Sequence, residues 1–60
     1  MTSESVMVGL RQAGWSLAEW STDRGCVAHA EQGGHRITIT APSSVLAWLV
    51  LWRRVTSGRG

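Results

Sequence analysis

A chain of 60 residues makes one domain, and a domain this small buries only about 60 % of the surface of its unfolded chain. The net charge of +2 comes from six arginines against four acidic residues, and the arginines are scattered, which is only a weak indication of an anionic partner. The single Cys26 excludes an internal disulfide, and the absence of a Cys/His cluster excludes a zinc site. The apolar run of residues 45–52 is too short for a transmembrane segment. We therefore expect a cytoplasmic protein, with no metal, cofactor or small-molecule ligand indicated.

The first expected element is a short amphipathic helix over residues 3–13. Thr2 or Ser3 can cap its start, and Gly14 can end it. Apolar residues recur along one side at three- and four-residue spacing: Val6, Met7, Leu10 and Ala13.

Three strands are expected next, over residues 15–22, 26–32 and 35–41. The first two are joined by Asp23-Arg24-Gly25, which suits a three-residue hairpin loop with the glycine in the left-handed bulge position. The second and third are joined by Gly33-Gly34, a dipeptide that suits a two-residue turn. The sequence therefore predicts two antiparallel hairpins that share the middle strand.

The Gly33-Gly34 turn predicts a register with one apolar and one polar face. The apolar side pairs Ala30 with Ile37, Ala28 with Ile39 and Cys26 with Ala41; the polar side pairs Glu31 with Arg36, His29 with Thr38 and Val27 with Thr40.

In the first hairpin, the three-residue loop predicts Trp20 opposite Ala28 and Ala18 opposite Ala30, which extends the apolar side, and Glu19 opposite His29. It also places Trp15 and Leu17 on the polar side, which has no good explanation unless Trp15 folds back under the first helix.

The last expected element is a helix over residues 42–55, which holds the densest apolar surface of the chain. Pro42 suits the first helical turn and the two serines after it can cap the helix. Gly58 can end it, so residues 56–60 are expected to form a frayed tail.

This helix is apolar on two sides. At about 100° per residue, a core-facing arc collects Val45, Trp48, Leu49, Leu51, Trp52 and Val55. On the back, Leu46 and Val50 lie four residues apart with Ala47 beside them, and only Arg53 and Arg54 make that side polar. A monomeric surface helix does not need a second apolar side, so this pattern indicates burial by a partner.

These elements predict an α+β domain with the order α-β-β-β-α, in which both helices pack on one face of a three-stranded antiparallel sheet. We expect Trp48 and Trp52 to make the main apolar contact, over Ala28, Ala30 and Ile39. Tryptophans supply all of the aromatic bulk, and each can bury roughly 150 to 250 Å².

Few residues indicate chemistry. His29 is a weak candidate for a catalytic residue, because Glu31, Arg36 and Thr38 are expected around it. An exposed Glu31–Arg36 pair beside an ordinary strand histidine explains the same residues, which favours a protein that is not an enzyme.

Part of the chain resembles a known family. Leu10-Arg11-Gln12-Ala13-Gly14-Trp15, a strand, Gly25, Gly34-His35-Arg36-Ile37-Thr38-Ile39 and Pro42 resemble the first two-thirds of the small HicA-type toxins. The resemblance implies the double-stranded-RNA-binding fold and cleavage of messenger RNA. In that family the catalytic histidine follows a Gly-Ser pair on the second strand. Here that position reads Gly25-Cys26-Val27, and His29 comes two places later.

Three hypotheses for function follow. The first is a small non-catalytic interaction module that forms a homodimer through Leu46 and Val50, with Arg53 and Arg54 as a polar rim. The alternative is an RNA-binding protein or a degenerate HicA-like ribonuclease, which would bind nucleic acid through the outer side of the sheet and basic side chains: Arg36, Arg53, Arg54 and Arg59. A third hypothesis is peripheral membrane contact by Trp48, Trp52 and the arginines.

Overall fold

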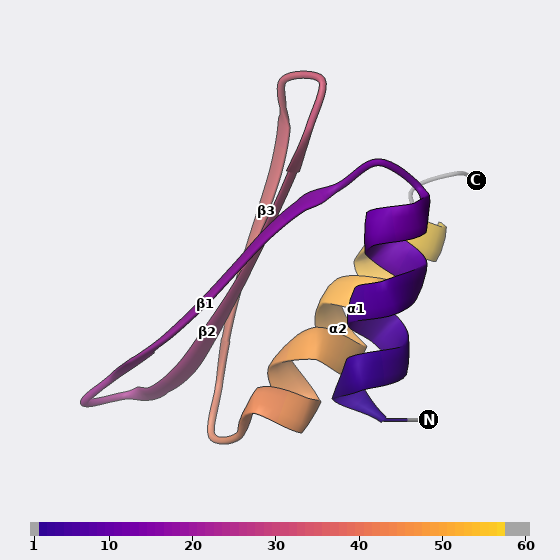
Figure 1. Ribbon diagram of the computed structural model, residues 1–60. Coiled ribbons are helices and arrows are strands. Elements are labelled where there is room, and N and C mark those ends of the chain that lie inside the picture. The colour runs from indigo at the N-terminus through magenta and orange to yellow at the C-terminus, as the bar shows by residue number, and fades with distance from the viewer. Residues whose placement is uncertain (1, 58–60) are drawn as a thin grey trace.

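Two helices cover one face of a twisted three-stranded antiparallel sheet in the computed structural model, which describes residues 2–57 (Figure 1). The strands lie in the order β1-β2-β3. The elements are α1 (Ser3–Gln12), β1 (Ser16–Thr22), β2 (Gly25–Gln32), β3 (His35–Ala41) and α2 (Ser44–Ser57). The predicted α+β fold is confirmed, and each predicted boundary of a helix or strand lies within two residues of the observed one. Below, the inner face of the sheet is the one that faces the helices, and the outer face is the other.

The two helices lie side by side and run in the same direction, so both begin at the same end of the molecule (Figure 1). Gly9 of α1 lies against the ring of Trp52 of α2: a Cβ at Gly9 would stand 3.5 Å from the indole. A methyl group at this position would make an ordinary van der Waals contact with the indole, so α1 and α2 pack closely here without requiring a glycine. No helix within residues 2–57 has the length and apolarity needed to cross a membrane.

Short polar side chains cap the start of each helix. The Thr2 hydroxyl accepts a hydrogen bond from the Ser5 amide at 3.2 Å. Before α2, the Ser43 hydroxyl accepts from the Leu46 amide at 3.3 Å, and its carbonyl accepts the first helical bond. Pro42 therefore precedes the cap, and its predicted place in the first helical turn is wrong.

The end of α2 also differs from the prediction, because Thr56 and Ser57 belong to the helix rather than to a frayed tail. Their hydroxyls donate back to the carbonyls of Trp52 and Arg53 in the preceding turn, as Ser and Thr side chains commonly do in helices. The predicted stop at Gly58 and the rest of the predicted tail lie outside the described residues.

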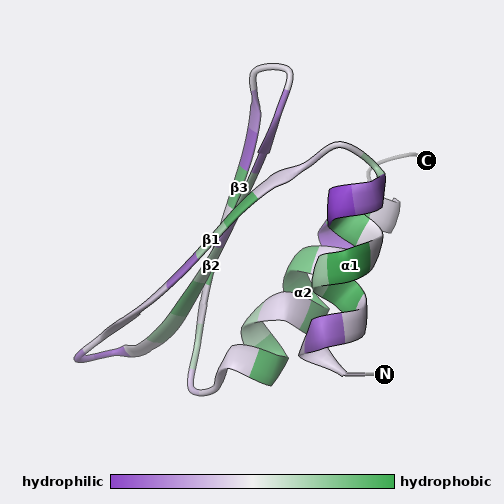
Figure 2. Cartoon of the chain, viewed as in Figure 1, coloured by the Kyte–Doolittle hydropathy of each residue, from purple (hydrophilic) through white to green (hydrophobic). Residues whose placement is uncertain are grey.

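The core is built around Trp48, which is completely buried over the small residues of β2. Its members are Val6, Leu10, Ala28, Ala30, Ile39, Ala47, Trp48 and Leu51. Apolar residues gather on the helices and in the middle of the strands, and hydrophilic residues at the tip of the β2–β3 hairpin (Figure 2).

Three details of the predicted helix faces are wrong. Val45, expected on the core-facing arc of α2, is 44 % exposed. Ala47, expected on the back of α2, is buried, and Trp52, expected at the centre of the core, is only half-buried beside α1. For Trp52 the cause is the position of α1, whose Gly9 lies against the indole and which a helical wheel for α2 alone does not contain.

The register of β2 and β3 is confirmed at every predicted pair, from Cys26 opposite Ala41 to Glu31 opposite Arg36. Both turn residues have positive φ, 52° at Gly33 and 89° at Gly34, as a type I′ turn requires.

The register of β1 and β2 differs from the prediction by one residue, because the connecting loop has two residues, Asp23 and Arg24, rather than three. Trp20 therefore pairs with Val27 and Ala18 with His29, and both lie on the outer face. Leu17, Glu19 and Ser21 take the inner face instead. The predicted pairing of Glu19 with His29 and the predicted place of Trp20 in the core are wrong.

Local contacts favour the shorter loop. The Thr22 hydroxyl accepts from the Arg24 amide at 3.1 Å, a local turn that needs no glycine inside the loop. Gly25 has a φ of 131° and starts β2 against the chain of β3, where a Cβ would stand 2.3 Å from the Ala41 carbonyl oxygen. The glycine is needed for this close approach, not for a bulge.

The shorter loop also explains the two residues that the predicted register left on the wrong side. Leu17 now faces inward opposite Ala30, and both it and Trp15 pack against the core. Trp48 fills the space over the alanines of β2, so no room is left there for a second indole from β1.

Candidate functional site

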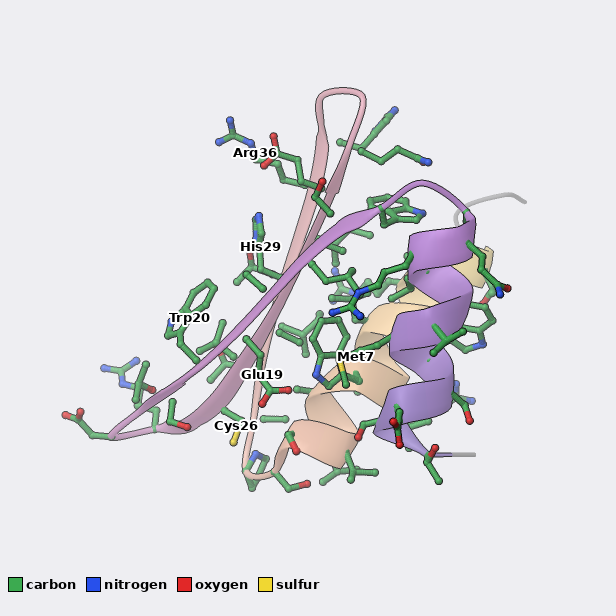
Figure 3. All side chains as sticks on the ribbon, viewed as in Figure 1. Met7, Glu19, Trp20, Cys26, His29 and Arg36 are labelled. Carbon is green, nitrogen blue, oxygen red and sulfur yellow. The ribbon has the colours of Figure 1, made fainter. Side chains whose placement is uncertain are left out.

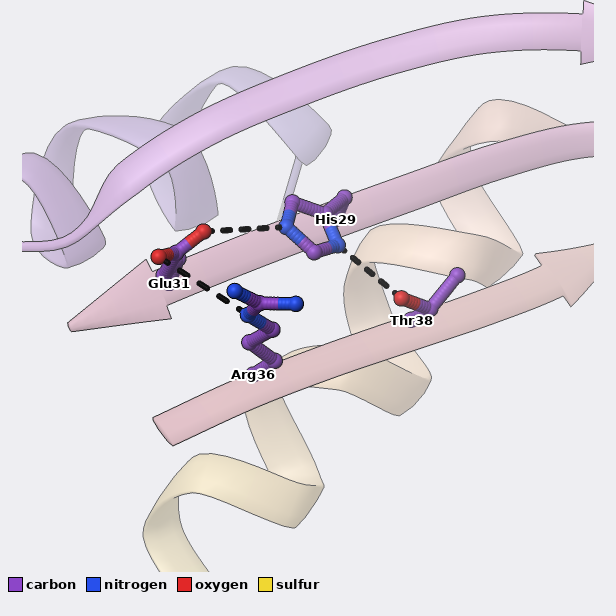
Figure 4. Close-up of polar contacts among 4 residues, drawn as sticks. All are labelled: His29, Glu31, Arg36 and Thr38. Atoms are coloured by element: carbon purple, nitrogen blue, oxygen red, sulfur yellow. Dashed lines mark hydrogen bonds and ion pairs between the residues drawn. The ribbon is translucent and has the colours of Figure 1, made fainter. Parts of the chain in front are cut away.

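A row of polar side chains lies on the outer face of the sheet (Figure 4). Nδ1 of His29 lies 2.9 Å from the Thr38 hydroxyl, and its Nε2 lies 3.7 Å from a carboxylate oxygen of Glu31. The other oxygen of Glu31 lies 3.8 Å from Nε of Arg36. The β2–β3 register positions all four residues, because residues opposite or two apart on one face are neighbours.

The order hydroxyl, imidazole, carboxylate resembles the arrangement of a nucleophile, a base and an orienting acid. An acyl-transfer site also needs N–H groups directed at the developing oxyanion. β2 pairs with a strand on both sides, so its amides are used within the sheet, and neither described pocket includes His29. The cluster can bind a hydrogen-bonding or charged group, but the backbone N–H groups of β2 beside it are not free to stabilise an oxyanion.

Trp20 adds an aromatic side chain to the same face. Its ring centroid lies 6.2 Å from that of His29, with the rings tilted by 42°, and the residue is 46 % exposed. Figure 3 shows Trp20 and His29 on one side of the sheet, while Glu19 points toward the helices. Sequence reasoning missed this neighbour of His29 because it assumed a three-residue loop; the possible turn at Thr22 was the signal for the shorter one.

The second candidate surface is the side of α2 that faces away from the sheet. Val45, Leu46 and Val50 are exposed by 44 %, 48 % and 39 %, respectively, and we call these three residues the α2 apolar face. Within residues 2–57, the other exposed large apolar residues are Trp20 of β1 and Val8 of α1. Most of the exposed apolar bulk of the described chain therefore lies on the helices.

Charges near the α2 apolar face are separated along the helices. Arg53 and Arg54 are exposed in the last turns of α2, and α2 contains no acidic residue. Glu4, exposed in the first turn of α1, is the single acidic residue of either helix. Because the helices run in the same direction, Glu4 lies at one end of the helical layer and the two arginines at the other (Figure 1).

A pocket of about 450 Å³ lies where the ends of α1 and α2 meet the tip of the β2–β3 hairpin. Trp15 and Trp52 supply aromatic surface, and Arg54 and His35 supply polar groups. We call it the tryptophan pocket. Its lining comes from four separate parts of the chain, so no local sequence pattern indicates it.

The predicted site residues thus fall on different surfaces. Leu46, Val50 and Arg53 share the exposed side of α2, and His29 lies on the opposite side of the sheet. Arg36 and Arg54 both line the tryptophan pocket. Arg59 lies outside the described residues. Trp48 is completely buried, so its predicted contact with a membrane is wrong.

Within residues 2–57, no three His, Cys, Asp or Glu side chains come together in a way that could hold a metal ion. No family model, characterised protein or solved structure matches the chain.

Proposed function

We propose that this protein is a small interaction module that self-associates through the α2 apolar face. The observation that carries the proposal is the exposure of Leu46 and Val50, one helical turn apart, with Val45 beside them. Apolar patches of this kind on a small protein mark sites of interaction. A cytoplasmic location belongs to the same proposal, since the lone thiol of Cys26 has no disulfide partner.

A second copy of the chain is the partner that the charges favour. In a twofold pairing with the two α2 helices antiparallel, Arg53 and Arg54 of one copy approach the end of the other copy where Glu4 lies. The attraction between Glu4 and the two arginines forms twice, once at each end of the dimer. A parallel pairing would instead bring four arginines together.

The size of the helix sets the expected strength. α2 has 14 residues and is about 21 Å long, enough for a contact at the lower end of stable interfaces. We expect a dissociation constant of roughly micromolar order, because such a contact must also offset the lost freedom of two chains.

Sedimentation equilibrium over a range of concentrations tests the proposal. Wild type should approach twice the chain mass of 6.5 kDa. Leu46→Glu should weaken association by at least about a hundredfold, because two leucines are lost from each dimer. Trp20→Glu is a matched control: Trp20 is 46 % exposed and Leu46 is 48 % exposed, but Trp20 lies on the outer face of the sheet.

Two results would oppose the proposal. One is a wild type that keeps the monomer mass at millimolar concentration. The other is equal weakening by Leu46→Glu and Trp20→Glu, which would move the contact away from α2. Circular dichroism of each variant shows whether the fold is retained.

Binding of single-stranded nucleic acid is the second candidate function, and the exposed Trp20 beside His29 favours it. Bases stack on exposed aromatic rings of sheet surfaces, and a nearby arginine such as Arg36, whose side chain is 73 % exposed, can contact phosphate. The resemblance to HicA-type toxins supports RNA as the nucleic acid.

A titration of fluorescein-labelled RNA at two salt concentrations tests this candidate. Binding should weaken with salt, with about 0.7 in the log-log slope for each phosphate contacted, and Trp20→Ala should weaken it about tenfold or more. Absence of binding in low salt rejects the candidate. Intact RNA after incubation separates a binding protein from a ribonuclease.

A further inference from the structure

The tryptophan pocket has the shape and lining of a small-molecule site. Its volume of about 450 Å³ falls in the range of ligand pockets, roughly 300 to 1,000 Å³. Three separate segments form its aromatic and aliphatic walls: Trp15 after α1, Ile37 in β3, and Trp52 with Val55 in α2. Both tryptophans are half-buried, so parts of their rings remain free to contact a ligand.

The polar groups of the pocket are basic or neutral. Arg54, Arg36 and His35 line it, and no Asp or Glu is among the lining residues. Arg36 already contacts Glu31, but no carboxylate within residues 2–57 forms an ion pair with Arg54. Arg54 is therefore the cation available to a ligand at this site.

Two backbone carbonyls near the helix ends already accept hydrogen bonds from side chains, which reduces the negative potential that helix C-termini add to the pocket. The Ala13 carbonyl at the end of α1 accepts from the side-chain Nε2 of Gln32 at 2.6 Å, and the Arg53 carbonyl accepts from the Ser57 hydroxyl at 2.7 Å. A carbonyl with a donor already in place attracts a further cation less, so these two carbonyls oppose the charge of Arg54 less strongly than free ones would.

From this combination of rings and unpaired cation, we infer that the tryptophan pocket binds a planar aromatic ring that carries one carboxylate or phosphate group. The ring packs against Trp15 and Trp52, and the acidic group pairs with Arg54. The α2 apolar face is not part of the pocket lining. Arg54 also lies at the end of α2 that the proposed dimer brings near Glu4, so the binding test includes a variant that does not self-associate.

The four indole N–H signals in a ¹⁵N–¹H spectrum of the full chain test the site directly. We use 1-naphthoate as the carboxylate probe, adenosine 5′-monophosphate as the phosphate probe, and 1-naphthylmethanol as the neutral control. Signals of Trp15 and Trp52 should shift with either anion, while those of Trp48, buried against Glu19, and Trp20, on the outer face, should stay in place. The anions should bind at least about tenfold tighter than the alcohol.

Neighbouring arginines provide matched variants. Arg54→Gln should weaken binding of the anions about tenfold, and Arg53→Gln should leave it within about twofold, because Arg53 does not line the pocket. The same spectra show that each variant is folded. Repeating the titration in Leu46→Glu keeps the result separate from self-association.

Two results would overturn the inference. One is no shift of the Trp15 and Trp52 signals up to about 5 mM of either anion, a weaker affinity than a specific small-molecule site gives. The other is equal loss of binding in the two arginine variants, which would indicate attraction to the net positive charge rather than to the pocket.

Discussion

The indole of Trp48 is the largest side chain that the fold buries completely. Its N–H donates to a carboxylate oxygen of Glu19 at 2.5 Å, so a residue of the edge strand β1 supplies the hydrogen bond that the buried tryptophan needs. Glu19 itself remains exposed at the margin of the inner face. This pairing keeps the charge in water while the ring fills the core.

The Trp48–Glu19 hydrogen bond leads to a prediction about stability. Glu19→Leu leaves the indole N–H without an acceptor and should lower the free energy of unfolding by about 1–3 kcal/mol. Glu19→Gln keeps an amide oxygen in place and should cost less than about 1 kcal/mol. Urea unfolding of the two variants measures the difference, and equal midpoints would show that the hydrogen bond does not contribute.

Two glycines with positive φ should respond differently to alanine. At Gly25 a Cβ meets the Ala41 carbonyl oxygen, whereas at Gly33 nothing lies within 4 Å of it. Gly25→Ala combines a strained backbone with overpacking, so we expect a loss of about 2–4 kcal/mol, against about 1–2 kcal/mol for Gly33→Ala. Thermal unfolding followed by circular dichroism compares them; a larger loss at Gly33 would contradict the position of Gly25 beside β3.

At the scale of whole elements, the two hairpins show what local sequence can determine. Gly33-Gly34 fits one turn type and separates runs with clear alternation, so the sequence predicts the β2–β3 register at every pair. Between β1 and β2, Asp23-Arg24-Gly25 is compatible with two loop lengths, and β1 alternates too weakly to choose. The local turn at Thr22 favours the shorter loop. Trp48 and the close approach of Gly25 to β3, which are contacts distant in sequence, favour it further.

The corrected register predicts unequal costs for removing two tryptophans. Trp48→Ala should cost about 3–5 kcal/mol and leave so small a domain largely unfolded, because total stability lies near the low end of roughly 5–15 kcal/mol. Trp20→Ala removes a cross-strand neighbour of Val27 and should cost about 1 kcal/mol or less. Chemical denaturation of both variants is the measurement. Similar losses would place Trp20 in the core and restore the three-residue loop.

For the molecule as a whole, the candidate sites differ in how far the sequence could predict them. The second apolar side of α2 is visible in the spacing of Leu46 and Val50, because it lies within one helix. The tryptophan pocket is not visible, since Trp15, His35 and Trp52 meet only when three elements pack together. The position of Trp20 beside His29 could be predicted only with the correct register of β1.

Across the molecule, the proposed dimer also predicts an effect of charge. Exchanging charge at one end, with Glu4→Arg, should weaken self-association, and adding Arg53→Glu and Arg54→Glu to the same chain should restore much of it. Light scattering at low salt measures both. Equal dissociation in the single and the combined variants would argue against an antiparallel arrangement.

The central claim is that α2 of one copy contacts α2 of another, and isotope-filtered NOE spectroscopy on a mixture of ¹³C-labelled and unlabelled chains tests it most directly. We predict cross-chain contacts from the methyl groups of Leu46 and Val50, whose exposure of 48 % and 39 % leaves them free to meet a partner. Cross-chain contacts from the edge strand β1 or from Trp20 in place of these methyl groups, or none at millimolar concentration, would contradict the claim.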